Sequence, residues 1–339
     1  MKISGTSSFS SNISLFSVIR HLYSLYAQMK KQEKDCKERI PAVIAGIIPP
    51  EEFSFSPKEI QRITKYYQLA LNLVCDNIYL LTGKKLSDTE HKSILQLSIF
   101  VPLIDDLFDE GLLPCEQIMT LISEPEKYTP VHNTDRIAHR LYCQLLDLVP
   151  HRERFIRNLT EGVYWENESL KQFDKHIGEE ELMRITYNKS YYSILLFCSV
   201  LNHYPCEATE AVLYPVSGLM QLTNDVFDVW KDTQKGLYTI PNLYADFGKL
   251  ESLFLDEISA INTRISSMGY PEKNRKAYLI RTHTLHAMGW MSLQQLKAVA
   301  SEKPLRELSR KELVCDLDNI PQQIRWVKHV RQLCNYAAK

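Results

Sequence analysis

The chain has 339 residues, of which 45% are hydrophobic and only 11 are glycine. That length allows a large core, and the low glycine content without a Gly/Ser-rich or Pro-rich linker favours a single helical domain. The 40 Lys and Arg residues almost balance the 41 Asp and Glu residues, so no overall field attracts nucleic acid or an anionic membrane.

Eight cysteines are scattered along the chain without a CxxC pair. This pattern argues against a zinc cage and against a disulfide framework, and it favours the reducing cytoplasm. No eighteen apolar residues follow one another, and the serine-rich N-terminus lacks the apolar stretch of a secretion signal. We therefore expect a cytoplasmic protein without a membrane span.

Apolar residues recur with a helical period along almost the whole chain. Residues 1–38 are expected to form an N-terminal segment, partly disordered and then helical from Leu15, followed by one domain over residues 39–339. Within that domain helices are predicted from Ser56 to Gly83 and from Ser87 to Phe108, and then over residues 134–148, 151–173, 179–203, 207–232, 250–267, 272–300 and 309–336. No alternating strand pair and no internal repeat is found, so the predicted fold class is all-α, a single-domain helical bundle.

A first acidic motif ends the apolar segment before Gly111. Asp105 and Asp109 are four positions apart and share one helix face, with Asp106 beside them. Like charges at this spacing repel and lose hydration, so they need a counter-ion. Magnesium bound to phosphate oxygens would supply one. The alternative is a solvated helix end.

A second acidic motif lies on another strongly apolar helix. Asn224, Asp228 and Asp232 follow one another at four-residue intervals, and Lys231 and Lys235 add positive charge. Such a stripe can bind a metal, and the lysines can donate to a diphosphate. The alternative is an amphipathic helix facing water, with Asp232 paired to a lysine. Two such clusters about 115 residues apart can face each other across a helical bundle.

With these motifs the sequence resembles the class I isoprenoid synthase superfamily over residues 55–335. That superfamily includes terpene cyclases, chain-elongating prenyl diphosphate synthases, and squalene and phytoene synthases. Asp105, Asp106 and Asp109 are similar to its aspartate-rich first motif. The second motif resembles the NDxxSxxxKE-like motif of cyclases, with aspartate at the serine and glutamate positions. The resemblance implies a bundle of the class I terpenoid synthase type with a central active-site cavity.

Other segments resemble sister branches of the superfamily. Residues 187–192 are similar to the lysine-bearing helix of chain-elongating synthases, and residues 218–228 resemble their second acidic region. Residues 221–236 also resemble the second motif of phytoene synthases. Against elongation, no paired arginines follow Asp109, and residues 83–85 are a poor match to the isopentenyl diphosphate site.

The resemblance also indicates basic residues for the diphosphate. Arg184 is forty positions before Asn224, near the place of the diphosphate-sensing arginine of bacterial cyclases. Arg325, followed by Trp326, is the nearest substitute for the C-terminal Arg-Tyr pair. The predicted diphosphate-binding residues are Arg184, Lys189, Lys231 and Arg325.

The implied activity is ionisation of farnesyl or geranylgeranyl diphosphate, with about three Mg²⁺ ions, and cyclisation of the carbocation with release of diphosphate. A prenyltransferase that joins two prenyl diphosphates is the alternative, and a non-catalytic helical scaffold is a third hypothesis. Aromatic side chains are expected to shield the cation. The predicted pocket residues are Phe100, Phe108, Tyr187, Tyr191, Phe227 and Trp290. A homodimer is a further expectation.

Overall fold

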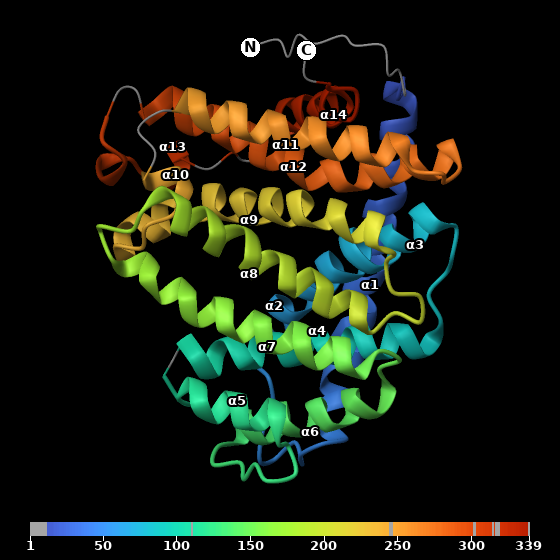
Figure 1. Ribbon diagram of the computed structural model, residues 1–339, viewed down its shortest axis with the longest axis vertical. Coiled ribbons are helices and arrows are strands. Elements are labelled where there is room, and N and C mark those ends of the chain that lie inside the picture. Colours follow the sequence, from blue (N-terminus) through green and yellow to red (C-terminus); the bar gives the residue numbers. More distant parts are fainter. Residues whose placement is uncertain are drawn as a thin grey trace. The chain divides into compact units, whose positions relative to one another are not determined.

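The computed structural model describes residues 12–109, 111–243, 247–300, 303–313, 315 and 319–337, without the side chain of Asp109. In this part of the chain every regular element is helical, which confirms the all-α prediction (Figure 1). No helix among the described residues is long and apolar enough to cross a lipid bilayer. The helices are α1 (Leu15–Ala45), α2 (Pro57–Leu69), α3 (Asp76–Thr82), α4 (Asp88–Asp109), α5 (Cys115–Ser123), α6 (Asn133–Leu148), α7 (Arg152–Glu168), α8 (Glu179–Ser199), α9 (Glu207–Lys235), α10 (Ile240–Leu243), α11 (Phe247–Ser267), α12 (Glu272–Ala300), α13 (Arg310–Leu313) and α14 (Ile320–Cys334).

Two predicted helices are interrupted. The helix expected from Ser56 to Gly83 contains a π-helical segment, Ala70–Cys75, between α2 and α3. The helix expected over residues 309–336 is divided into α13 and α14, because Asn319 caps a new helix whose first turn contains Pro321. Proline has no backbone N–H, so it fits a helix start and disfavours a helical residue before it.

The chain forms two compact units. The first unit comprises Met1–Tyr23, Glu168–Tyr191 and Cys206–Lys339, and the second comprises Ser24–Asn167 and Tyr192–Pro205. The boundary expected after residue 38 falls inside α1. The disorder expected near the N-terminus concerns residues 1–11, which lie outside the described residues.

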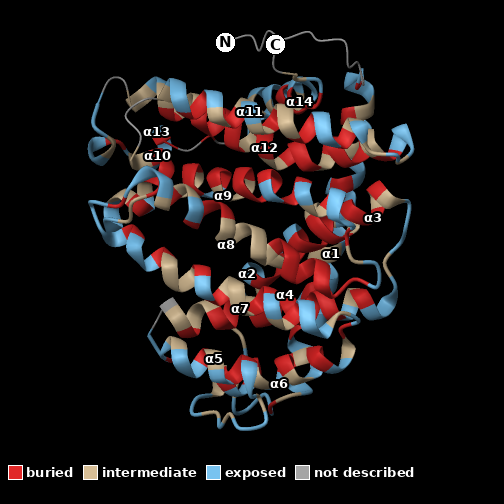
Figure 2. Ribbon diagram, viewed as in Figure 1, coloured by how far each residue is buried: buried red, intermediate tan, exposed pale blue. Residues whose placement is uncertain are grey.

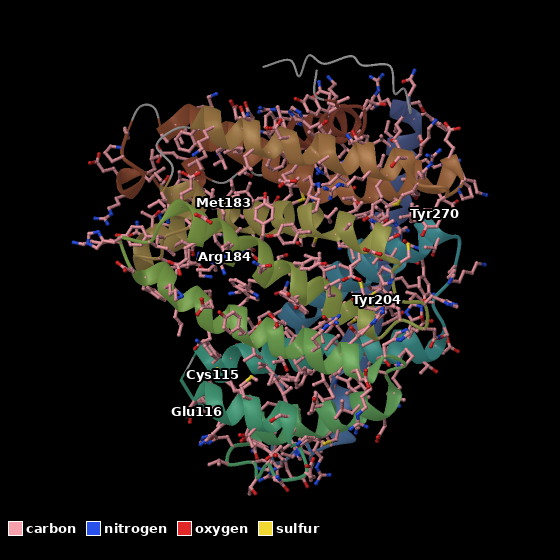
Figure 3. The ribbon with its side chains drawn as sticks, viewed as in Figure 1. Cys115, Glu116, Met183, Arg184, Tyr204 and Tyr270 are labelled. Atoms are coloured by element: carbon pink, nitrogen blue, oxygen red, sulfur yellow. The ribbon has the colours of Figure 1, made fainter. Side chains whose placement is uncertain are left out.

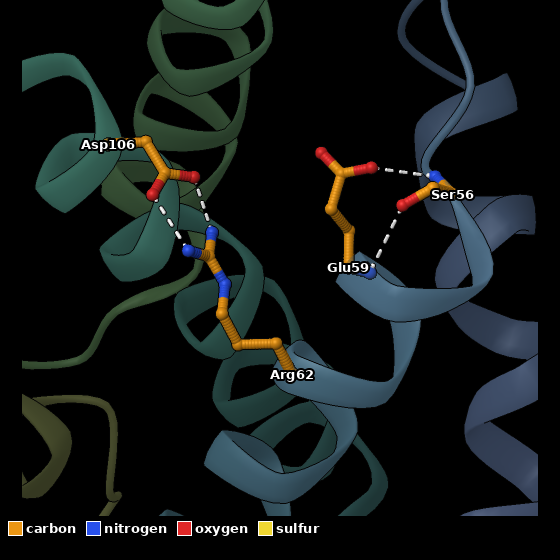
Figure 4. A network of polar contacts seen from close by, with 4 residues as sticks. All are labelled: Ser56, Glu59, Arg62 and Asp106. Carbon is orange, nitrogen blue, oxygen red and sulfur yellow. Dashed lines mark hydrogen bonds and ion pairs between the residues drawn. The ribbon is translucent and has the colours of Figure 1, made fainter. Parts of the chain in front are cut away.

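In the second unit, α2 begins with a capping box. The Ser56 hydroxyl accepts from the Glu59 amide, and the Glu59 carboxylate accepts from the Ser56 amide, with Pro57 at the first helical position (Figure 4). These contacts satisfy amides that have no partner within the helix. They define the start of α2 and thereby the position of Arg62 one turn later. α2 packs against α4, which also packs against α6.

In the first unit, α9 lies beside α11 and α12, and α12 also packs against α14 (Figure 1). Buried residues recur along α9 and α12 (Figure 2). Two glycines permit close approaches. A Cβ at Gly218 would lie 2.2 Å from the Tyr187 ring of α8, and a Cβ at Gly289 would lie 2.1 Å from the Thr223 hydroxyl. α9 ends at Gly236, whose φ of 70° is left-handed.

A buried histidine pair joins α12 to α11. The amide nitrogen of Asn262 donates to the carbonyls of Leu333 and Tyr336 at 2.8 Å each, so its oxygen accepts from Nε2 of His283 at 2.8 Å. Nδ1 of His283 is then an acceptor for Nδ1–H of His286 at 3.1 Å. Burial lowers the pKa of His286 to about 3 and lowers that of His283 well below its usual value. Both rings are therefore neutral in the folded protein near pH 7.

This pair predicts acid sensitivity. The unfolded histidines take up protons below about pH 6.5, whereas the folded ones resist protonation, so stability should fall as the pH drops below that value. We expect each histidine to contribute a loss of up to about 1.4 kcal/mol per pH unit. Urea unfolding of wild type and His286→Asn at several pH values measures the difference. Asparagine keeps a donor near the Nδ1 position but has no ring that titrates. If the free energy of unfolding depends on pH in the same way in both proteins, His286 does not cause the acid sensitivity.

Candidate functional site

The two acidic motifs lie on different compact units. The first motif is on α4 of the second unit, and the second motif is on α9 of the first unit. Their predicted meeting across a cavity stays a prediction, and each motif is described by itself.

At the first motif, an arginine from α2 meets Asp106. Nη1 of Arg62 donates to Oδ1 of Asp106 at 2.7 Å, and Nη2 donates to Oδ2 (Figure 4). Asp105 and Asp106 are both half-buried. The bond to Asp106 raises the pKa of the Arg62 guanidinium, and the charge of Asp105 adds to this effect. The pair is bidentate, the geometry that makes Arg–carboxylate contacts strong.

Arg62 changes the expectation for this motif. From the sequence alone, a metal ion was expected to be the counter-ion of these carboxylates. In the structure the counter-ion of Asp106 is the guanidinium of Arg62. Binding of a metal by Asp106 would require the pair to separate, after which Arg62 would be available to an anion. The side chain of Asp109 lies outside the described residues.

A half-buried tyrosine lies near the same motif. Tyr66 follows Arg62 by one turn of α2, and its hydroxyl lies 3.4 Å from Oγ of Ser193. Burial raises the pKa of Tyr66, and the charges of Asp105 and Glu166 raise it further. Tyr66 therefore remains a neutral hydroxyl beside the acidic cluster.

At the second motif, the predicted stripe has an uneven environment. Asn224 is exposed, the Asp228 side chain is 40% exposed, and Asp232 is 6% exposed. The sequence reading missed Asp225, which is 4% exposed. Nε2 of Gln221 donates to Oδ1 of Asp225 at 2.8 Å, and Oδ2 has no hydrogen-bond partner among the described residues. The four-residue spacing from Gln221 was the available signal for this pair.

The surroundings of Asp225 and Asp232 disfavour ionisation of these two carboxyls. Burial raises the pKa of Asp225 to about 7 and that of Asp232 to about 6, and the neighbouring Asp228 adds to both shifts. Lys189, from α8, lowers both values. Nζ of Lys231 lies 3.5 Å from Oδ2 of Asp228. The cluster would gain stability from a cation at its carboxylates.

The other two basic candidates are exposed. Arg184 lies on α8, where its charge acts on Tyr214 (Figure 3). Arg325 lies on α14, next to Trp326, whose Nε1 donates to the carbonyl of Thr284 at 2.9 Å. Within the described residues, no contact joins Arg325 to the acids of α9.

Three of the predicted pocket aromatics on the first unit have defined partners. The hydroxyl of Tyr187 donates to Glu257 at 2.9 Å, and its buried ring occupies the space beside Gly218. Tyr191 meets Tyr214 edge to face at 5.2 Å between centroids. Trp290 is buried against Phe254 at 5.5 Å.

The remaining pocket candidates differ in burial. Phe227 on α9 and Phe108 on α4 are half-buried. Phe100 is fully buried in the second unit and stacks on Tyr142 with 5.8 Å between centroids. This contact is ordinary core packing.

The donor chemistry fits magnesium. No group of three or more His, Cys, Asp or Glu side chains in the described part of the chain is arranged to hold a metal ion. Magnesium, however, commonly uses one or two carboxylates together with substrate phosphates. Asp228 and Asp232, with Asn224 beside them, offer such oxygen ligands, and so does Asp105 on the other unit.

A surface pocket lies elsewhere on the first unit. It has a volume of about 500 Å³ and is lined by Cys206, Thr209, Arg264, Met268 and Tyr270, among others. None of the predicted site residues lines it. Tyr270 marks its place in Figure 3.

No family model and no curated protein matches the chain. What the residues define is an all-α protein with two acidic helix faces, each supplied with positive charge by a neighbouring helix or turn.

Proposed function

We propose that the chain is a magnesium-dependent class I isoprenoid synthase that ionises one prenyl diphosphate and cyclises the carbocation. The observation that carries this proposal is the α9 cluster. Asp225, Asp228 and Asp232 gather on a mostly buried helix, and Lys189 and Lys231 act on their charges. Such a combination of oxygen ligands and phosphate donors suits a metal-bound diphosphate.

In this proposal some residues bind magnesium and others bind the diphosphate. Magnesium, when bound, supplies the positive charge that stabilises a departing diphosphate. Asp228 and Asp232, with Asn224, would hold it at α9, and Asp105 would do so at α4. Lys231 and Lys189 would donate to the diphosphate oxygens. Arg184 and Arg325 keep this role as expectations from the resemblance, and the structure relates the charge of Arg184 to Tyr214 and that of Arg325 to His329.

The proposal also covers the type of helical bundle, the cellular location, the number of metal ions and the oligomeric state. The fold would be the helical bundle of the class I terpenoid synthases with a central cavity, where Tyr187, Tyr191, Phe227 and Trp290 would face the cation. A cytoplasmic location is supported by the cysteines, all eight of which are free. The expected number of about three magnesium ions and the homodimer remain predictions.

A prenyltransferase is the second candidate, and one observation favours it. Lys189 belongs to the segment that resembles the lysine-bearing helix of chain-elongating synthases, and it acts on Asp225 and Asp232. A basic residue so placed would suit a diphosphate in either enzyme class. A second diphosphate site is what a prenyltransferase would need in addition.

One experiment separates these candidates. The purified protein is offered geranyl, farnesyl or geranylgeranyl diphosphate with magnesium, and released diphosphate and the hexane extract are measured. A cyclase gives a hydrocarbon or alcohol of unchanged carbon number, and chelation of the metal stops the reaction. Isopentenyl diphosphate should not lengthen the product. A longer prenyl diphosphate, or a product of doubled carbon number, would replace the cyclase by the prenyltransferase. No release from any substrate would refute both.

A further inference from the structure

The first turns of α1 present large apolar side chains to solvent. Phe16 is 76% exposed and Tyr23 is 74% exposed. Val18, Leu22 and Leu25, which lie beside this exposed face on the same turns, are buried. The exposed set is Leu15, Phe16, Ile19, Tyr23 and Tyr26. Isolated exposed apolar residues are ordinary, but a contiguous group indicates an interaction surface.

The same face of α1 continues with lysines. With a rotation of about 100° per residue, Lys30, Lys34 and Lys37 follow Tyr26 on one side of the helix. All three are exposed, and Nζ of Lys30 lies 5.8 Å from the Tyr26 ring centroid. Lys30 also pairs with Glu33 at 3.3 Å, but both side chains are exposed, so the pair adds little. The face is thus apolar and aromatic over three turns, and over the next three it has a net positive charge because three lysines outnumber Glu33.

We propose that this face of α1 binds the surface of an anionic lipid bilayer. The aromatic turns would enter the boundary between headgroups and acyl chains, and the lysines would meet lipid phosphates. Arg20, Lys31 and Glu38, all exposed, border the face, so the bordering residues add a net positive charge. The charge of the whole chain is close to balance, so the attraction would be local to α1.

The charges favour lipid over a second copy of the chain. No Asp or Glu occurs between Asn12 and Gln32. Residues 1–11 contain none either, so an antiparallel copy of α1 centred on the apolar turns would bring no Asp or Glu to the lysines, whereas a parallel copy would place lysines against lysines with Glu33 beside them. An anionic bilayer provides an apolar interior for the aromatic turns and negatively charged headgroups for the lysines.

Vesicle sedimentation tests the proposal with the full-length protein. Vesicles of phosphatidylcholine alone are compared with vesicles that contain phosphatidylcholine and phosphatidylglycerol in equal parts. We expect binding only to the anionic vesicles, and weaker binding at high salt. Lys30→Gln/Lys34→Gln/Lys37→Gln should weaken it roughly 100-fold, and Phe16→Ser/Tyr23→Ser by about tenfold or more.

Matched controls come from the same chain. Lys58→Gln/Lys84→Gln/Lys85→Gln changes the net charge equally at other exposed lysines, and Ile320→Ser/Ile324→Ser removes exposed apolar residues of α14. Both control variants should bind like the wild type, and circular dichroism checks that every variant is folded. The proposal is overturned if the wild type ignores anionic vesicles or if the controls weaken binding as much as the α1 variants. It is also overturned if Phe16→Ser/Tyr23→Ser converts a dimer to a monomer without affecting vesicle binding.

Discussion

Asp228→Ala is expected to lower the rate of diphosphate release at least about a thousandfold, because it removes a central oxygen ligand of the proposed α9 metal site. The fold should tolerate this change. Asp228 forms one ion pair, with Lys231, and both side chains are substantially exposed, so its loss should change stability by less than about 1 kcal/mol. Released diphosphate is measured with each prenyl diphosphate, and the melting temperature is recorded in parallel. Comparable losses are expected for Asp105→Ala and Asn224→Ala.

Asp256→Ala is the matched control, since Asp256 is an exposed aspartate of the same unit, on α11. It should retain full activity. If Asp228→Ala instead unfolds the protein, or if it is as active as Asp256→Ala, the metal role of the α9 acids is wrong.

Gly289→Ala is expected to destabilise the protein by about 2 kcal/mol or more, the usual result of overpacking a tight contact. The added Cβ would lie 2.1 Å from Oγ1 and 2.9 Å from Cβ of Thr223. Because the threonine Cβ is attached directly to the α9 backbone, rotation of its side chain cannot relieve the contact, and α9 and α12 must separate. Urea unfolding measures the loss. α9 carries the acidic cluster, so activity should fall as well.

Two further variants test this explanation. Gly162→Ala, within α7, adds a Cβ with no atom within 4 Å, so it should stabilise the helix by about 0.5–1 kcal/mol. Adding Thr223→Ala to Gly289→Ala removes the closest atom and should restore part of the stability. Equal effects at both glycines, or no recovery in the double variant, would show that the close contact is not the cause.

Local sequence patterns determined most of the helices of this protein. The apolar period through residues 207–232 predicted α9, and Gly236 ends that helix with a left-handed residue. The π-helical segment at Ala70–Cys75 was not predictable in this way, because its residues are apolar and suit an α-helix equally well. The division into α13 and α14 had a local signal in Asn319 and Pro321 that the apolar period concealed.

The sequence by itself also determined which helices carry the acidic residues, since four-residue spacing places side chains on one helix face. Only the tertiary structure decided their environment. Arg62 reaches Asp106 from 44 positions away, and Lys189 acts on Asp225 and Asp232 from another helix. Burial then distinguishes adjacent residues, with Asp225 enclosed and Asn224 exposed. Helical periodicity depends on near neighbours in the chain, whereas counter-ions and burial depend on which helices pack together, and local spacing contains no information about that.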